Sequence, residues 1–412
     1  MKIAFIVGAF PCLSETFILD QITGLIDLGH KVEIFAHGNN REEKTHASVE
    51  AYHLMEHTHY PPKSPGKRFQ RILKSVGLII RAFPRHPWKT LMMLWAFRHY
   101  RKMTLLRFVG FVVPFFSKHF DIIHCHFGPN GVTGISLKEI GIPTPLLTTF
   151  HGYDINSYPK TAGRNVYNKL FKKGNLFTAN SEFTKKQMTA LGCPENKIDL
   201  LPVGLNLERF TFQTRTAPSD GQIRILTVAR FVEKKGHQFA IKAIAKVIRK
   251  HPHIIYTLAG DGPLKKEIVT LVSELHIKEN VKFAGAINQK EIARLYQQTH
   301  LFLLASVTAH DGDKEGQGLV LQEAQACGIP IISTIHNGIP EGVLDGKSGY
   351  LVPERNAEAL AEKIEYLLEH PQQWASMGRY GHDFVEERYD INILNKRLVK
   401  IYKKAEACAN PA

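Results

Sequence analysis

The sequence predicts an α/β protein made of two doubly wound domains, each a parallel sheet with helices packed on both faces. Short apolar runs recur along the chain, and helical patterns or clusters of turn residues separate them, which is typical of alternating strands and helices. The 412 residues, 44% of them hydrophobic, are enough for two domains with a core each. A polar segment rich in Thr, Pro, Ser and Gly at residues 210–221 predicts the linker between them.

The first domain is expected to open with a βαβ unit. Strands are predicted at residues 2–7 and 31–36, and a helix at 14–28 joins them, with Ser14 as its N-cap and Gly29 at its end. Further strands of this domain are expected at 121–125, 146–150 and 176–179.

The second half repeats this alternation more regularly. Its strands are expected at residues 223–228, 254–259, 281–284, 301–304, 329–333 and 349–352. The expected domains are therefore 1–209 and 222–380, joined by the linker and followed by a C-terminal helical segment at 381–412.

Residues that directly follow strands are the first candidates for a binding site, because doubly wound sheets bind ligands at the carboxyl ends of their strands. Arg230 and Gly260 follow the first and second strands of the second domain, and His151 follows a strand of the first. We expect the two domains to face each other across a cleft that holds the ligands.

Two carboxylates stand eight residues apart around a glycine-bordered helix start in the second domain. Glu315 precedes Gly316 and Gly318, and the apolar run that follows predicts a buried helix containing Glu323. Eight helical residues would advance about 12 Å and return to within about 80° of the starting face, so one ligand could reach both carboxylates. The glycines and the positive end of the helix favour a diphosphate at its start.

Cations are expected beside that diphosphate. Arg230 and Lys235 lie in the short loop after the first strand of the second domain, so one turn can direct two positive charges at a departing diphosphate. The alternative is a solvated basic turn, and Lys234 is interpreted as such a surface residue.

The net charge of +15 is concentrated in one segment of the first domain. Residues 57–120 contain no Asp or Glu but thirteen Lys and Arg, interleaved with large apolar residues. This pattern favours amphipathic helices on an anionic membrane surface, and the alternative is a helical insertion whose apolar faces pack on the core. A solvated tail that binds nucleic acid would contain fewer Leu, Ile, Phe and Trp, so nucleic acid is not expected as a partner.

Cysteine usage favours a reducing cytoplasm, because the five cysteines are scattered and form no C-x-x-C pair. The longest apolar run, at 108–116, contains Pro114 and is too short to cross a bilayer. A strand from residue 2 leaves no room for a cleavable leader. We therefore expect a cytoplasmic protein, peripheral on the inner face of the membrane.

Two segments resemble metal sites, but neither is interpreted as one. His124 and His126 share one face of a strand, and the sequence marks no third ligand beside them. Asp311 and Asp313 flank a glycine in the second segment. No metal and no other cofactor is expected.

Several motifs spread over nearly the whole chain occur together. They are the paired glutamates with their glycines, Arg-x4-Lys-Gly at 230–236, HGYD at 151–154, SEFTKKQM at 181–188, PVGLNLERF at 202–210 and AGDGP at 259–263. Together they resemble the retaining glycosyltransferases of family 4, which have the GT-B fold of two Rossmann-like domains. The segments PCLSETFILDQI and SVTAHDGDKEG look most like the colanic-acid type branch, which builds bacterial exopolysaccharides.

The resemblance implies roles at the donor site. Glu323 would hold the ribose hydroxyls, and Glu315 would lie beside the transferred sugar. The main-chain N–H groups of Gly318 and Leu319 would reach the diphosphate. Arg230 and Lys235 would supply the positive charge that a metal provides elsewhere, and for this reason the segment 311–313 is not interpreted as a cation site. Gly260 and Gly316 are also assigned to the donor site.

His151 is implied beside the sugar, where it would orient hydroxyls. The first βα loop departs from the family pattern, because Ser14, Glu15 and Thr16 replace the usual flexible glycines. Contact with the acceptor is therefore expected there, with Asp154 as another acceptor-side candidate. The resemblance also implies that the C-terminal helical segment returns to the N-terminal, acceptor-binding domain.

The sequence thus predicts a retaining glycosyltransferase of hexosyltransferase type. It would move a sugar from a nucleoside diphosphate sugar to a growing, lipid-linked polysaccharide. Alternatives are a sugar-nucleotide epimerase or hydrolase on the same fold, or a noncatalytic scaffold that binds glycan or lipid. The joint presence of Arg230, Lys235, Glu315 and Glu323 argues against the scaffold.

Overall fold

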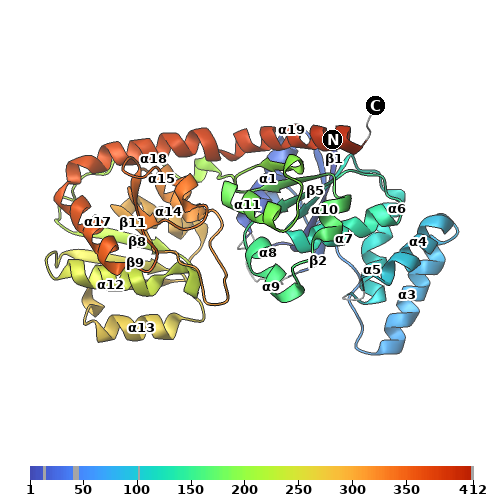
Figure 1. Cartoon of the computed structure of the whole chain (residues 1–412), viewed down its shortest axis with the longest axis horizontal. Helices are drawn as coiled ribbons and strands as arrows, with labels where there is room; N and C mark the ends of the chain where they lie inside the picture. Colours follow the sequence, from blue (N-terminus) through green and yellow to red (C-terminus); the bar gives the residue numbers. More distant parts are fainter. Residues whose placement is uncertain (13–14, 40–45, 101–102, 410–412) are drawn as a thin grey trace. The chain divides into compact units, whose positions relative to one another are not determined.

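The computed structural model describes residues 1–12, 15–39, 46–100 and 103–409 and divides into two compact units (Figure 1). The first unit comprises Met1–Asn180, Lys185–Leu201 and Asn395–Ala412, and the second comprises Ser181–Thr184 and Pro202–Leu394. The division between the main segments therefore falls between Leu201 and Pro202. Residues 210–221, expected to be a linker, belong to the second unit, where the guanidinium of Arg215 donates to the carbonyl oxygens of Gln297 and Cys327.

The first unit contains a seven-stranded parallel sheet in the order β3-β2-β1-β4-β5-β6-β7. Its strands are β1 (Lys2–Ala9), β2 (Lys31–Gly38), β3 (Thr58–His59), β4 (Ile122–His126), β5 (Leu146–Phe150), β6 (Leu176–Ala179) and β7 (Ile198–Leu200). All the strands predicted for this half are present, and the short edge strands β3 and β7 are additional. The central strands are buried on both faces, which explains their nearly continuous apolar sequences.

Helices connect these strands. They are α1 (Thr16–Asp27), α2 (Ala47–Ala51), α3 (Arg68–Ala82), α4 (Pro87–Phe97), α5 (Leu105–Val112), α6 (Pro114–Ser117), α7 (Gly128–Glu139), α8 (Tyr153–Asn156), α9 (Tyr158–Ala162) and α10 (Asn168–Lys173). The expected cap of the first helix, Ser14, lies outside the described residues, and Glu15 occupies the N-cap position without a side-chain cap.

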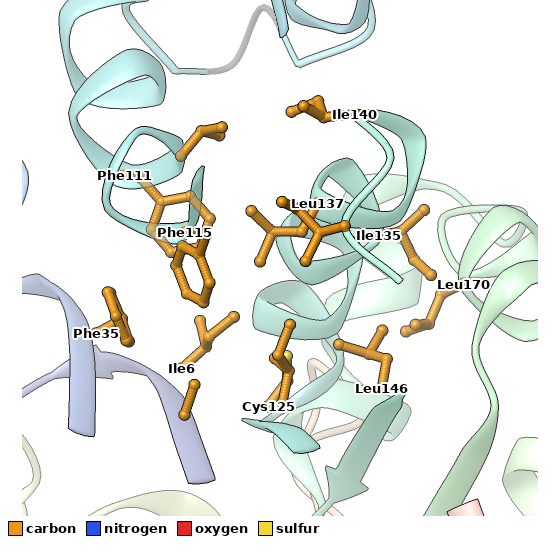
Figure 2. Close-up of a cluster of buried hydrophobic side chains, with 14 of the residues drawn as sticks. Ile6, Phe35, Phe111, Phe115, Cys125, Ile135, Leu137, Ile140, Leu146 and Leu170 are labelled. Atoms are coloured by element: carbon orange, nitrogen blue, oxygen red, sulfur yellow. The ribbon is translucent and has the colours of Figure 1, made fainter. Parts of the chain in front are cut away.

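The inner part of the basic segment 57–120 packs on the core of the first unit. Figure 2 shows Phe111 of α5 and Phe115 of α6 next to Ile6 and Phe35 of the sheet, and the rings of Phe35 and Phe115 are 4.2 Å apart. The helices α3 and α4 pack against α5 (Figure 1) but leave much of their own apolar surface exposed. The inner part of the segment therefore packs as the second alternative predicted, a helical insertion on the core, and the membrane alternative stays a prediction.

The second unit contains a six-stranded parallel sheet in the order β10-β9-β8-β11-β12-β13. Its strands are β8 (Ile223–Val228), β9 (Ile254–Ala259), β10 (Val281–Gly285), β11 (Leu301–Leu304), β12 (Ile331–Thr334) and β13 (Gly349–Val352). Chain order reverses between β8 and β11, as it does between β1 and β4 in the first sheet. Ligands of doubly wound sheets bind at such reversal points.

Helices of the second unit follow its strands. They are α12 (His237–Ile248), α13 (Lys265–Glu274), α14 (Gln289–Gln298), α15 (Leu319–Ala326), α16 (Ile339–Gly342), α17 (Ala357–Glu369) and α18 (Trp374–Tyr389). The helices α11 (Glu182–Ala190) and α19 (Ile391–Ala409) have residues in both units. Within the described ranges, no helix combines the length and the apolar character needed to cross a membrane.

Candidate functional site

The strongest candidate site of the second unit lies on the loops after β8 and β11, the two strands at the reversal point of the sheet. Gly236 allows these loops to meet, because its φ is +63° and an added Cβ would lie 1.7 Å from the carbonyl oxygen of Ala305. No other residue type fits that space or favours that backbone conformation. The Val307 N–H donates to the carbonyl oxygen of Lys234 at 2.9 Å and joins the loops a second time.

Lys235 and Glu315 form an ion pair across these loops, and their side chains are only 12% and 13% exposed. Burial alone would raise the pKa of the Glu315 carboxyl, but Lys235 and Lys234 outweigh it and lower the pKa to about 2. Glu315 is therefore fully ionised at neutral pH and cannot donate a proton. The structure joins these two of the predicted catalytic residues directly.

The neighbouring Lys234 is not the solvated residue that the sequence suggested. Its side chain is 12% exposed and its Nζ lies 3.0 Å from the carboxylate of Asp313. Asp313 belongs to the segment DGD, whose sequence resembled a cation site. The cation that its carboxylate contacts is the ammonium group of Lys234. Sequence alone could not show this pairing, because 79 positions separate the partners.

Arg230 has the opposite character, because its side chain is exposed. Among the described residues, none forms an ion pair or side-chain hydrogen bond with its guanidinium, whereas its carbonyl oxygen accepts a hydrogen bond from His237 Nε2 at 3.1 Å. Gly260 lies beside this loop with a φ of +146°, and an added Cβ there would lie 2.0 Å from the carbonyl oxygen of Ala229. The backbone under Arg230 is thus fixed while its charge is available to a ligand.

Main-chain and histidine contacts that the sequence analysis missed hold the backbone of Glu315. The Glu315 N–H donates to Nε2 of the buried His336 at 3.0 Å, so the other ring nitrogen of His336 carries the proton and donates to Glu354. Asn337 Nδ2 donates to the Glu315 carbonyl oxygen at 2.9 Å. These residues follow β12 and β13, so only the strand order brings them to Glu315.

The eight-residue spacing of the glutamates does not have the helical geometry that we expected. The helix α15 begins at Leu319, and Gly318 is its N-cap in the left-handed conformation, so Glu315 and Gly316 precede the helix. The estimate of 12 Å and 80° therefore does not apply. Leu319 occupies the first helical position, and its N–H, like those at every helix start, has no acceptor within the helix.

Glu323 lies on α15 and interacts with a different partner from Glu315. The hydroxyl of the fully buried Tyr296 donates to Glu323 Oε2 at 2.8 Å. Burial, and then the charge of Glu323, raises the pKa of Tyr296 well above its ordinary value, so this tyrosine remains a donor. Tyr296 was not predicted as a site residue, and it orients the carboxylate expected to hold the ribose.

In the first unit, His151 follows β5 and is fixed through its backbone. Its N–H donates to Asp154 Oδ1 at 3.0 Å, and its carbonyl oxygen accepts from Asn180 Nδ2 at 2.7 Å. Asp154 is fully buried and also accepts from the N–H groups of Gly128 and Gly152, both at 2.9 Å. Its carboxylate therefore binds the chain around His151.

The predicted acceptor residues differ in position. Ser14 lies outside the described residues, Glu15 is the N-cap of α1 and Thr16 is its first residue. His151, which the sequence marked as a site residue but did not place near the HCH segment, lies beside it: the rings of His126 and His151 stack at 5.4 Å. In the described chain, the residues that could gather around a metal are His382, Asp383 and Glu386 on α18, with both carboxylates exposed.

Comparison with sequence families matches each half of the chain to a family model. Residues 14–209 match the model described as Glycosyltransferase Family 4, and residues 208–384 match Glycosyl transferases group 1. WcaL of Escherichia coli K12, a candidate colanic acid biosynthesis glycosyltransferase, is 33% identical over 97% of this chain and 99% of its own. AmsK of Erwinia amylovora, an amylovoran biosynthesis glycosyltransferase, is 32% identical over 98% of this chain and 100% of its own.

Solved structures share the fold at lower sequence identity. Anabaena HepE in complex with UDP and glucose superposes with a TM-score of 0.70 and 19% identity, over 97% of this chain and 98% of that one. A sucrose-phosphate synthase from Thermosynechococcus elongatus gives the same TM-score at 21% identity, over 98% of both chains. These likenesses and the two reversing sheets confirm the GT-B fold predicted from the sequence.

Proposed function

Because the chain belongs to the family 4 and group 1 glycosyltransferases, we propose that it moves a hexose from a nucleoside diphosphate sugar to a growing exopolysaccharide. We propose further that the anomeric configuration of the donor is retained and that no metal is required. The names of the relatives support an exopolysaccharide as the product. The charged residues on the loops after β8 and β11 support transfer from a nucleoside diphosphate sugar.

The observation that carries the proposal is the arrangement of Arg230, Lys235 and Glu315. A diphosphate gains negative charge as the glycosidic bond breaks, so it needs preorganised cations more than a proton donor. Arg230 is exposed on a fixed backbone, and Lys235 is held against a carboxylate that stays ionised. In this proposal the two cations bind the leaving diphosphate, and the ion pair with Glu315 orients Lys235.

The nucleotide would extend from this point along α15. The N–H groups at the start of the helix suit a phosphate oxygen. Glu323, oriented by Tyr296, presents a carboxylate that can accept hydrogen bonds from ribose hydroxyls.

The test is turnover of purified protein with a panel of UDP-, GDP- and ADP-sugars and polysaccharide-repeat acceptors. We expect one donor to support transfer in the presence of EDTA, with the product linkage keeping the donor's configuration by NMR. An inverted linkage would refute retention, and loss of activity with EDTA would refute metal independence. Consumption of donor without transfer would indicate an epimerase or hydrolase, and binding without turnover would indicate a scaffold.

We also propose that the acceptor is lipid-linked and that α3 and α4 bind the anionic cytoplasmic face of the membrane. On α3 and its C-cap, five exposed apolar residues recur at helical spacing and form one stripe: Phe69, Ile72, Val76, Ile80 and Phe83. On α4, Trp88, Leu91 and Trp95 do the same, and Trp88 is 71% exposed. We call these eight residues the α3–α4 stripe.

Charge selects an anionic bilayer as the occupant of the α3–α4 stripe. Exposed cations accompany it at Lys67, Arg68, Lys74, Arg81 and Arg85. No acidic residue occurs between His57 and Phe120 to repel anionic lipid. Exposed apolar side chains interleaved with cations match the headgroup and acyl layers of such a membrane. The five free cysteines are compatible with the reducing cytoplasmic side.

Vesicle sedimentation tests the membrane proposal. We expect the protein to sediment with vesicles containing phosphatidylserine and far less with phosphatidylcholine alone. Replacing Arg68, Lys74 and Arg81 by Gln should weaken partitioning about a hundredfold, since each cation near the surface contributes roughly 1 kcal/mol. The matched control replaces the exposed lysines 266, 278 and 290 of the second unit by Gln. Equal sedimentation with both vesicle types, or an equal loss in the control, would contradict the proposal.

A further inference from the structure

His151 is held on every side except one ring nitrogen. Besides the two backbone hydrogen bonds, the rings of Phe17 and Phe127 pack on it at 4.8 Å and 4.6 Å. Phe127 adopts a φ of 69°, a strained conformation for a bulky residue that concentrates at functional sites. Nδ1 of His151 is buried and meets no donor among the described residues.

A chain of hydrogen bonds leads from α1 to the other ring nitrogen. Gln21 Oε1 lies 2.9 Å from His126 Nε2, and His126 Nδ1 lies 3.1 Å from His151 Nε2. The amide oxygen can only accept, so His126 carries its proton on Nε2 and offers a lone pair at Nδ1. His151 then donates from Nε2, which leaves its Nδ1 as an acceptor.

This assignment of protons requires that the imidazoles of His126 and His151 are both neutral. Burial lowers the pKa of His126 well below its ordinary value, with the neighbouring His124 and His151 adding to the effect. Burial also lowers the pKa of His151 to about 3. Each ring therefore carries one proton at neutral pH, and an acceptor fixed at one end, the amide oxygen of Gln21, sets the direction of the whole chain.

His124, whose ring also lies next to that of His126, does not belong to this chain of hydrogen bonds. The ring of His124 is 4.4 Å from that of His126, but its Nδ1 lies 2.8 Å from the Tyr402 hydroxyl and its Nε2 lies 2.7 Å from Thr149 Oγ1. Both nitrogens of His124 are satisfied, so it does not compete for His126.

We propose that Gln21 and His126 are positioning residues that fix the tautomer of His151, so that Nδ1 accepts a hydrogen bond from a hydroxyl of the transferred sugar. The identity of the hydroxyl ligand rests on the proposed function. The tautomer does not, because it follows from the side chains of the first unit alone.

The direct test is long-range ¹H–¹⁵N NMR of full-length protein labelled with ¹⁵N-histidine. A His151→Gln variant assigns the two ring nitrogens of His151 by their disappearance. We expect the wild-type Nδ1 to give the signal of a bare nitrogen and Nε2 that of a protonated one. The opposite assignment in the wild type would overturn the proposal without any need for a further variant.

Variants at Gln21 test the direction of the chain. Gln21→Lys replaces an acceptor by a donor and should reverse the tautomer, whereas Gln21→Leu should leave a mixture. We expect kcat to fall roughly ten- to a hundredfold in Gln21→Lys, because an N–H would then face a hydroxyl that must donate. Thr23→Leu, at a half-buried position on the same helix whose hydroxyl bonds only within α1, is the control and should keep both tautomer and kcat.

The outcomes separate the control of the His151 tautomer by Gln21 and His126, which we call the relay, from the proposed function. A changed tautomer in Gln21→Lys without sugar transfer by any form of the protein would support the relay and refute the transferase proposal. Loss of activity in Gln21→Lys or Gln21→Leu with an unchanged His151 tautomer would overturn the relay and leave the transferase intact.

Discussion

The carboxyl edges of the two sheets are built from different chemistry. In the second unit the loops after β8 and β11 carry half-buried ion pairs, Lys235 with Glu315 and Lys234 with Asp313. In the first unit the equivalent edge carries histidines that burial keeps neutral and a carboxylate bound to main-chain N–H groups.

This difference matches what each edge must do in the proposed reaction. A diphosphate that gains charge needs fixed cations, and an ion pair with a carboxylate fixes the position of Lys235. Sugar hydroxyls do not change charge, so a neutral acceptor in a fixed orientation suffices for them. The comparison predicts that substitutions in the second unit affect turnover most and that the two units respond to acid differently.

The largest expected effect is that of Lys235→Ala. Loss of one preorganised donor to a departing oxyanion costs roughly 3 to 4 kcal/mol, so kcat should fall about a hundred- to a thousandfold with a much smaller change in donor affinity. Steady-state kinetics with the active donor measures this. Lys246→Ala is the matched control, because Lys246 also pairs with a glutamate, Glu358, but at the surface, with side chains 45% and 63% exposed. Equal losses in both variants would show that Lys235 acts only through stability.

A smaller effect on binding is expected for Glu323→Gln. The neutral amide weakens hydrogen bonds from ribose hydroxyls, and a bond to a charged group is worth about 1.5 to 3 kcal/mol. Calorimetric affinity for the free nucleoside diphosphate should therefore fall roughly ten- to a hundredfold. Tyr296→Phe should reduce affinity less, because it removes only the group that orients Glu323. Unchanged affinity in a folded Glu323→Gln protein would remove the ribose role.

Contacts of the site could be predicted from the sequence only where the two residues lie close together along the chain. The central strands were predicted within a few residues because each is buried on both faces, whereas β3 and β7 are too short to give a pattern. Arg230 and Lys235 share one loop and could be paired in advance. The contacts between His126 and His151 and between His336 and Glu315 arise from neighbouring strands and loops, so spacing along the chain could not reveal them.

The spacing of the two glutamates shows a different limit. A count of eight residues implied one continuous helix, but Gly318 adopts the left-handed conformation and α15 starts only after it. The glycine that suits a phosphate also interrupts the helical geometry from which the distance was calculated.

Acid should destabilise the first unit more steeply than the second, because burial lowers the pKa of more histidines in the first. The depressed pKa of His151, about 3 against an ordinary 6.5, means that the unfolded chain binds its proton first. Stability is therefore lost as pH falls below 6.5, by about 1.4 kcal/mol per pH unit for each such histidine. The Glu315 carboxyl, with a pKa of about 2 against an ordinary 4.5, contributes stability above pH 4.5 that is lost only as pH falls toward 2.

Hydrogen exchange by mass spectrometry between pH 7 and 5 can follow each unit separately. We expect protection of β4 and β5 to fall further in this range than protection of β8 and β11, beside which burial lowers the pKa of His237 and His300 to about 4. His124→Gln, which removes one of the histidines whose pKa burial lowers to about 3, should flatten the response of the first unit. An equal loss of protection in both sheets would contradict the assignment of the larger acid response to the histidines of the first unit.

The α3–α4 stripe also has a consequence for the protein away from any membrane. Its apolar side chains attract those of another copy at short range, while the surrounding cations repel the whole segment over about 10 Å at 0.1 M salt. Added salt shortens this repulsion and leaves the apolar attraction intact, so copies should associate as ionic strength rises. Purification in dilute buffer or mild detergent should keep the chain dispersed, and concentrated salt should precipitate it.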